Sequence, residues 1–133
     1  MKGDVLLQNI KVIGLVPMFT GKKAKDNNLL IREAILTKLG KNIDNVQKRC
    51  AGKPLSLTVS FLLHATTLNK KDLDTLSDNL IKILGDELST KKESLKGLEI
   101  IKDTTLIHRI ILEKILIKKD LKEEFSFSIY EWD

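Results

Sequence analysis

Acidic residues are concentrated between residues 72 and 86, where they alternate with leucine and isoleucine. Within this stretch, Asp74, Asp78, Lys82 and Asp86 follow one another at intervals of four. In an α-helix that interval places side chains in one stripe, here beside the leucine face. Two carboxylates four residues apart on a helix repel each other by roughly 0.2–0.5 kcal/mol. The stripe therefore indicates either acids that favour the positive end of a helix or acids that bind a cation.

Both interpretations are compatible with the sequence. Acids in the first turn of a helix are stabilising by ~0.3–1 kcal/mol each, and Asp72 or Asp74 would make an ordinary N-cap. The alternative is a Mg²⁺ site, because Mg²⁺ prefers one or two carboxylates together with water and phosphate oxygens. Asp103 precedes the apolar segment 106–117 and could join such a site, although an isolated aspartate there is most often a turn residue. The candidate metal ligands are Asp72, Asp74, Asp78 and Asp103.

The positive charge lies mainly in the first third of the chain. The formal net charge is +5, and residues 1–50 alone hold 10 basic and 4 acidic side chains. Lys22, Lys23 and Lys25 surround Gly21 and could attract phosphates, although a solvated lysine-rich loop has the same pattern. The whole chain has only three arginines, which are the usual side chains for reading guanine edges. We therefore expect nucleic-acid contacts mainly with the backbone.

Hydrophobic periodicity predicts a small α/β fold of the α+β type. Period-two alternation indicates strands, whereas apolar steps of three and four indicate helices. The expected order is β-α-β-α-β-β, with a small mixed sheet packed against two main helices. The spacing in 106–117 would also suit a helix. We assign strands to residues 9–16, 55–63, 106–117 and 125–131, helices to 28–39 and 73–88, and loops to 18–27, 40–54 and 89–97.

Length and composition exclude several classes of protein. A chain of 133 residues with 42% hydrophobic residues can bury one core without disulfides or a structural metal, so we expect a single domain over residues 1–133. Cys50 is the only cysteine, which excludes an internal disulfide framework. No apolar run approaches the ~20 residues that span a bilayer, and no signal peptide precedes the first polar residues. We therefore expect an intracellular protein with no membrane partner.

Other catalytic patterns are missing from the sequence. His64 and His108 lie in apolar segments, where a lone histidine is usually a hydrogen-bonded structural residue. The chain has no metal-type cysteine spacing, no phosphate-binding glycine loop and no serine-nucleophile motif. The acidic stretch and Asp103 are the strongest candidates for chemistry.

These residues resemble the core of the RusA-like Holliday-junction resolvases. In that family two aspartates flank one residue and are followed by asparagine, by lysine three residues further on, and then by aspartate and leucine. Asp72-Leu73-Asp74 and the run from Asp78 to Leu88 are similar to this pattern. Residues 102–107, with Lys114 beyond them, resemble the family's acidic turn and the strand that ends in lysine. The first strand, ending near Gly14, and the basic stretch after it are similar to the family's opening.

The resemblance implies a homodimeric, Mg²⁺-dependent endonuclease that nicks opposed strands of four-way DNA junctions in recombination and repair. Its catalytic residues would be Asp74, Asp78, Lys82 and Asp103. The carboxylates would hold the metal against the scissile phosphate and activate water, while the lysine would stabilise the developing charge. The protein would be cytoplasmic and nucleoid-associated, and its contacts with the DNA backbone would come from Lys22, Lys23, Lys25 and Lys114.

The sequence departs from the family pattern at one aspartate. If Asp78-Asn79 and Lys82 match the motif, its first aspartate falls on Leu76, and Asp74 would have to replace it from one turn earlier. If Asp72 and Asp74 are the pair, Thr75 and Asp78 replace the motif's asparagine and lysine. The displacement favours a second hypothesis, a catalytically weak or inactive RusA-like module that binds DNA or a protein. The retained Asp-Asn-x-x-Lys pattern favours the nuclease.

Overall fold

Four strands form a single mixed sheet in the computed structural model, which describes residues 2–85 and 96–132. Their order across the sheet is β1-β4-β2-β3. Strand β4 is antiparallel to both of its neighbours, whereas β2 and β3 are parallel. The predicted fold class is confirmed, and the three strands predicted at 55–63, 106–117 and 125–131 share this sheet. The strands are β1 (Lys2–Ile13), β2 (Leu55–Leu63), β3 (Ile107–Leu116) and β4 (Glu124–Trp132).

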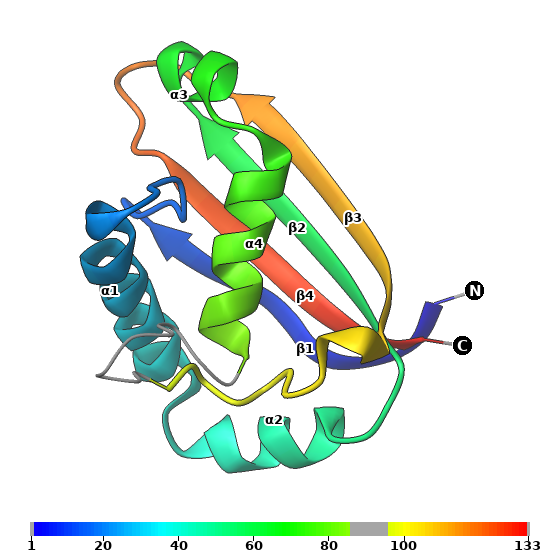
Figure 1. The fold of residues 1–133 in the computed structure, drawn as a ribbon. Helices are drawn as coiled ribbons and strands as arrows, with labels where there is room; N and C mark the ends of the chain where they lie inside the picture. Colours follow the sequence, from blue (N-terminus) through cyan, green and yellow to red (C-terminus); the bar gives the residue numbers. More distant parts are fainter. Residues whose placement is uncertain (1, 86–95, 133) are drawn as a thin grey trace.

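The two longest helices cover one face of this sheet (Figure 1). A short helix, α2, lies across the end of the sheet at which α1 finishes, and α3 follows directly after β2 (Figure 1). No helix within residues 2–85 and 96–132 combines the length and the apolar character that a membrane crossing requires. The helices are α1 (Lys22–Leu39), α2 (Ile43–Cys50), α3 (Ala65–Lys70) and α4 (Leu73–Leu84), with 3-10 turns at η1 (Gly40–Asn42) and η2 (Thr104–Leu106).

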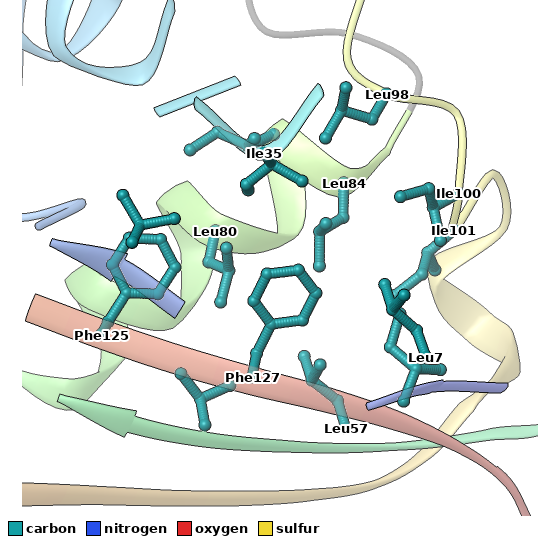
Figure 2. Packing of buried hydrophobic residues seen from close by; sticks show 14 of the residues in the cluster. Leu7, Ile35, Leu57, Leu80, Leu84, Leu98, Ile100, Ile101, Phe125 and Phe127 are labelled. Carbon is teal, nitrogen blue, oxygen red and sulfur yellow. The ribbon is translucent and has the colours of Figure 1, made fainter. Parts of the chain in front are cut away.

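The core fills the space between the sheet and α1 and α4. Alternate residues of β2 and β4 point into it, and the leucine face of α4 packs onto them (Figure 2). Burying a side chain of this size contributes about 1.5–3 kcal/mol, so this layer is the main source of stability. Fully buried residues of this layer include Leu57, Phe61, Leu76, Leu80, Phe125 and Phe127.

The connection between the parallel strands β2 and β3 determines where the acidic residues lie. Parallel neighbours need a crossover, and here α3 and α4 supply it. Helix α4 begins at the end of β2 and runs back along the sheet (Figure 1). Its last turn meets the segment before β3, since the backbone N–H groups of Leu98 and Ile101 donate to the carbonyls of Ile83 and Leu84 at 2.8 and 2.9 Å. The two ends of α4 therefore lie at opposite ends of β3.

Several predicted boundaries in the first half of the chain were wrong. Residues 18–27 are not all loop, because α1 begins at Lys22 and includes the basic cluster. Lysine and alanine favour helices even where no apolar periodicity is visible. The predicted connection 40–54 contains α2, whose buried Val46 and Cys50 are four residues apart. Strand β1 covers residues 2–13 rather than 9–16.

Other boundaries agree with the prediction. Helix α1 ends at Leu39, followed by Gly40 with φ of 52°, which is the predicted stop. The predicted segment 106–117 forms a strand over residues 107–116, not a helix, and Leu106 belongs to η2. The predicted helix 73–88 ends earlier than expected, because α4 stops at Leu84 with Gly85 as its C-cap. Residues 86–88, including Asp86, and most of the predicted loop 89–97 lie outside the described residues.

Candidate metal and nucleic-acid site

The acidic stripe of α4 is exposed, as the periodicity predicts. Asp74, Asp78 and Lys82 are exposed, whereas Leu76 and Leu80 are fully buried on the opposite side of the helix. Asp72 occupies the N-cap position, but its side chain makes no capping hydrogen bond. Its carboxylate is thus not used in the way that the ordinary capping interpretation requires. Asp74 and Asp78, one turn apart, are both accessible to a cation.

Asn79 has a structural role that the sequence did not suggest. The residue is 7% exposed, and its Nδ2 donates hydrogen bonds of 2.9 Å to the carbonyl oxygens of both Pro17 and Phe19. Asn27 of α1 makes a similar bond of 2.8 Å to the carbonyl of Val16. These two amides fix the loop between β1 and α1 against the middle of α4. The motif's asparagine therefore positions the segment that leads into the basic cluster.

The basic cluster lies at the beginning of α1. Lys22, Lys23 and Lys25 are exposed in the first turns of the helix, after Gly21 with φ of 67°. The N-cap residue Gly21 has no side chain with which to cap this end, and no acidic residue lies in the first turn. The helix dipole adds positive potential to that of the lysines, a combination that favours phosphate. The first residues of α1 can therefore contact a nucleic-acid backbone, with the preceding loop held against α4.

Lys114 is in a different position. Its half-buried side chain extends from β3 to α3, and Nζ donates to the carbonyl oxygen of Leu68 at 2.8 Å. The ammonium thus stabilises the end of a short helix and lies at the end of β3 where α4 begins.

Asp103 is the N-cap of η2 and is fully exposed. Its Oδ1 accepts hydrogen bonds from the Thr105 hydroxyl at 2.6 Å and from the Thr105 backbone N–H at 3.0 Å. These bonds, that of the hydroxyl first, lower the pKa of Asp103 below its ordinary value because they stabilise the carboxylate. The expected role of an aspartate in a turn is therefore fulfilled. The carboxylate is ionised at neutral pH and, being exposed, is accessible to a ligand.

The predicted acids do not all meet within one chain. Asp72 and Asp74 lie at the beginning of α4, whereas Asp103 lies beyond its far end, next to the start of β3. The 12 residues of α4 extend about 18 Å. Among the described residues, no group of three or more His, Cys, Asp or Glu side chains is placed to hold one metal ion. Sheet order and helix direction cause this separation.

Both histidines have structural contacts. His64 follows β2 rather than lying within it, and its Nε2 is 2.6 Å from the carbonyl oxygen of Leu121. His108 is exposed on β3 and meets the edge of Trp132, with ring centroids 6.5 Å apart. The guanidinium carbon of Arg109 is 6.0 Å from the centroid of the same indole ring. No local sequence pattern indicates this contact, because it joins strands that are not adjacent in the sheet.

No family model and no curated protein matches this sequence. The RusA-like resemblance therefore depends on residues 72–88 and 102–114 themselves.

Proposed function

We propose that the chain is a RusA-like, Mg²⁺-dependent endonuclease for four-way DNA junctions, with each active site built from two copies of the chain. The motif residues Asp74, Asp78 and Lys82 are exposed on one helix face, as ligands of a phosphate-bound metal must be. The basic start of α1 supplies contacts with the DNA backbone. The observation that carries the proposal is that Asp103 lies before the start of β3, whereas Asp72 and Asp74 lie near its end.

Strand β3 is suited to pairing with another strand. It forms one edge of the sheet, and no other strand in the described part of the chain covers its outer side. It is also long and apolar, with Ile110, Ile111, Ile115 and Leu116 exposed. Edge strands of this kind are normally protected or paired, because their free backbone groups recruit other chains. We therefore place the dimer contact at β3.

The residues of β3 favour one antiparallel register. With the two-fold axis at Ile111, Arg109 lies opposite Glu113 of the second copy, and the two-fold symmetry makes this contact twice. Both side chains are on the sheet face away from the helices, where Glu113 already accepts a 2.7 Å hydrogen bond from Ser60. Opposite charges facing each other across strands stabilise a pair, and like charges destabilise it. A register shifted by one residue would place Arg109 opposite Lys114.

This pairing brings the separated acids to the same end of the joined sheet. Antiparallel strands place the start of one β3 beside the end of the other. Asp103 precedes the start, whereas the end of β3 pairs with the last residue of β2, after which α3 and α4 begin. Asp103 of one copy is thus directed toward Asp72 and Asp74 of the other. Two such sites, related by a two-fold axis, match a junction in which two opposed strands are cut.

The residues of this combined site fit the proposed chemistry. Carboxylates and water are the ligands that Mg²⁺ prefers, and the bound ion would supply charge neutralisation at the scissile phosphate. Asp103 is held as a carboxylate by Thr105 and is ready to contribute an oxygen ligand. Lys82 lies eight residues after Asp74 on the exposed stripe, about 12 Å along α4, so its compact positive charge would act on the DNA backbone beside the metal rather than on the metal-bound phosphate.

Subunit mixing tests this proposal directly. Asp74→Asn and Asp103→Asn each damage both sites of their own dimer, so each variant alone should not nick a four-way junction. In a mixed dimer one site keeps Asp74 from one copy and Asp103 from the other. After subunit exchange, half of the dimers are mixed and each has one intact site, so roughly a quarter of the wild-type rate should return.

Two outcomes would contradict the proposal. An active wild-type protein whose variants never complement each other would show that each site belongs to one chain. If wild-type protein binds the junction but does not cut it with Mg²⁺ or Mn²⁺, the proposed nuclease activity is wrong. The second hypothesis, a non-catalytic DNA-binding module, would then remain. That hypothesis is favoured by the cap geometry of Asp103 and by the absence of a three-acid cluster within the described part of one chain.

A further inference from the structure

A groove on the opposite edge of the sheet takes no part in the proposed nuclease site. It lies between the edge strand β1, the end of α1 and α2, and encloses ≈ 560 Å³. This volume is within the range of about 300–1,000 Å³ that is typical of ligand-binding pockets. We call it the β1 groove. Residues 5–8 and 10 of β1 line it, so the groove runs beside this part of the strand.

The floor and the rim of the β1 groove differ in chemistry. Leu6, Leu39 and Val46 line the groove and are almost fully buried, so they form an apolar floor. Lys38 and Arg49 line it as well, and both are exposed. Arg49 is fixed at the strand edge, because its Nη2 donates to the carbonyl oxygen of Val5 at 2.9 Å. An apolar floor beside a positively charged rim is suited to an occupant that carries apolar and acidic groups together.

The surroundings of the groove are also positive. Residues 38–53, which cover the end of α1, η1 and α2, hold five basic side chains and one acidic side chain. Strand β1 is an edge strand, and no other strand in residues 2–85 and 96–132 pairs with its outer side. Its pairing with β4 is interrupted by three register shifts. Such irregularities twist the edge and discourage a second copy from extending the sheet.

We propose that the β1 groove binds a short, extended peptide segment of a partner protein, with apolar side chains on the floor and acidic side chains at Lys38 and Arg49. Strand addition at a sheet edge is a common mode of peptide recognition, in which the backbone provides affinity and alternate side chains provide specificity. A DNA backbone is the less suitable occupant, because its phosphates gain nothing from buried leucine and valine. This function is independent of junction cleavage.

A selection from random peptides tests the proposal. The probe is a phage-displayed library of twelve-residue peptides, selected on the full-length protein. We expect enrichment of sequences in which Val, Ile or Leu alternate with Asp or Glu. Added to ¹⁵N-labelled protein, a synthetic peptide of the enriched sequence should shift amide signals of residues 5–10 and 38–49. Lys38→Glu and Arg49→Glu should each weaken its binding at least tenfold, while Lys119→Glu, the same charge change in the turn before β4, should not.

Folding of each variant is checked by its circular dichroism, and Lys38→Glu remains decisive if Arg49→Glu is destabilised by losing its bond to Val5. The proposal is overturned if no peptide is enriched, if the signals that shift lie outside the β1 groove, or if both rim variants bind as tightly as wild type. It is also overturned if an oligothymidine competes for the groove more strongly than the selected peptide does, since the site would then belong to nucleic acid.

Discussion

At the scale of single residues, Asn79 matches the asparagine of the RusA-like pattern, and its side chain stabilises the fold. Its amide donates hydrogen bonds to two carbonyl oxygens of the loop before α1. Asn79→Ala should lower the free energy of unfolding by ~1–3 kcal/mol, the usual effect of leaving buried polar groups without partners. Urea denaturation measures this change. Asp78→Ala, one residue away and exposed, is the matched control and should change stability by less than about 0.5 kcal/mol. Equal effects of the two substitutions would show that Asn79 does not hold the loop between β1 and α1 in place.

Cys50 gives a second prediction at this scale. Burial raises the pKa of its thiol to about 11, against the opposing effect of Arg49 and Lys53. A thiol reacts as the thiolate, so little of the reactive form exists at pH 8 in the folded protein. Alkylation by iodoacetamide at pH 8 should therefore be slow in native protein and should accelerate when denaturant exposes the thiol. The rate of mass increase measures this. Fast alkylation of native protein would show that Cys50 is accessible and ionised.

At the scale of elements, β3 carries the dimer prediction. If Arg109 faces Glu113 of a second copy, Arg109→Glu or Glu113→Arg alone would place like charges opposite each other at two points of the interface. Each single substitution should shift the protein toward the 15 kDa monomer in sedimentation experiments at micromolar concentration. The double substitution exchanges the charges and should restore the dimer. A double variant as monomeric as the single ones would contradict this register, and a monomeric wild type would contradict the β3 contact.

The elements also show what the sequence could predict. Alternation in β2 and β4 and the leucine spacing of α4 are local patterns, and all three elements are present at the expected positions, although α4 ends at Leu84 rather than at residue 88. Helix α2 was missed because only Val46 and Cys50 of its eight residues are buried, which leaves little periodicity to detect. The beginning of α1 was missed because its first residues are polar. Short amphipathic segments next to glycine or proline are the positions at which such errors are expected.

The geometry of the candidate site was beyond the reach of local patterns. The sequence predicts that Asp74 and Asp78 share an exposed stripe, and they do. It does not show where Asp103 lies relative to them, because that depends on β2 pairing in parallel with β3 and on the direction in which α4 crosses the sheet. These are long-range features, set by packing across the core. Because Asp103 lies far from Asp74 within one chain, we propose that the site is shared between two copies.

At the scale of the whole molecule, metal binding and dimer formation should be linked. An ion held by Asp103 of one copy and by Asp72 and Asp74 of another binds the dimer and not the monomer, so Mg²⁺ should shift the equilibrium toward the dimer by mass action. Sedimentation velocity with EDTA or Mg²⁺ at matched ionic strength measures the shift. Asp103→Asn should remove the Mg²⁺ effect and leave the dimer seen in EDTA unchanged, because it alters no residue of β3. Asp4→Asn, an equal charge change on β1, should keep the full effect. If Mg²⁺ strengthens the Asp103→Asn dimer as much as the wild type, the ion acts elsewhere and the shared site is wrong.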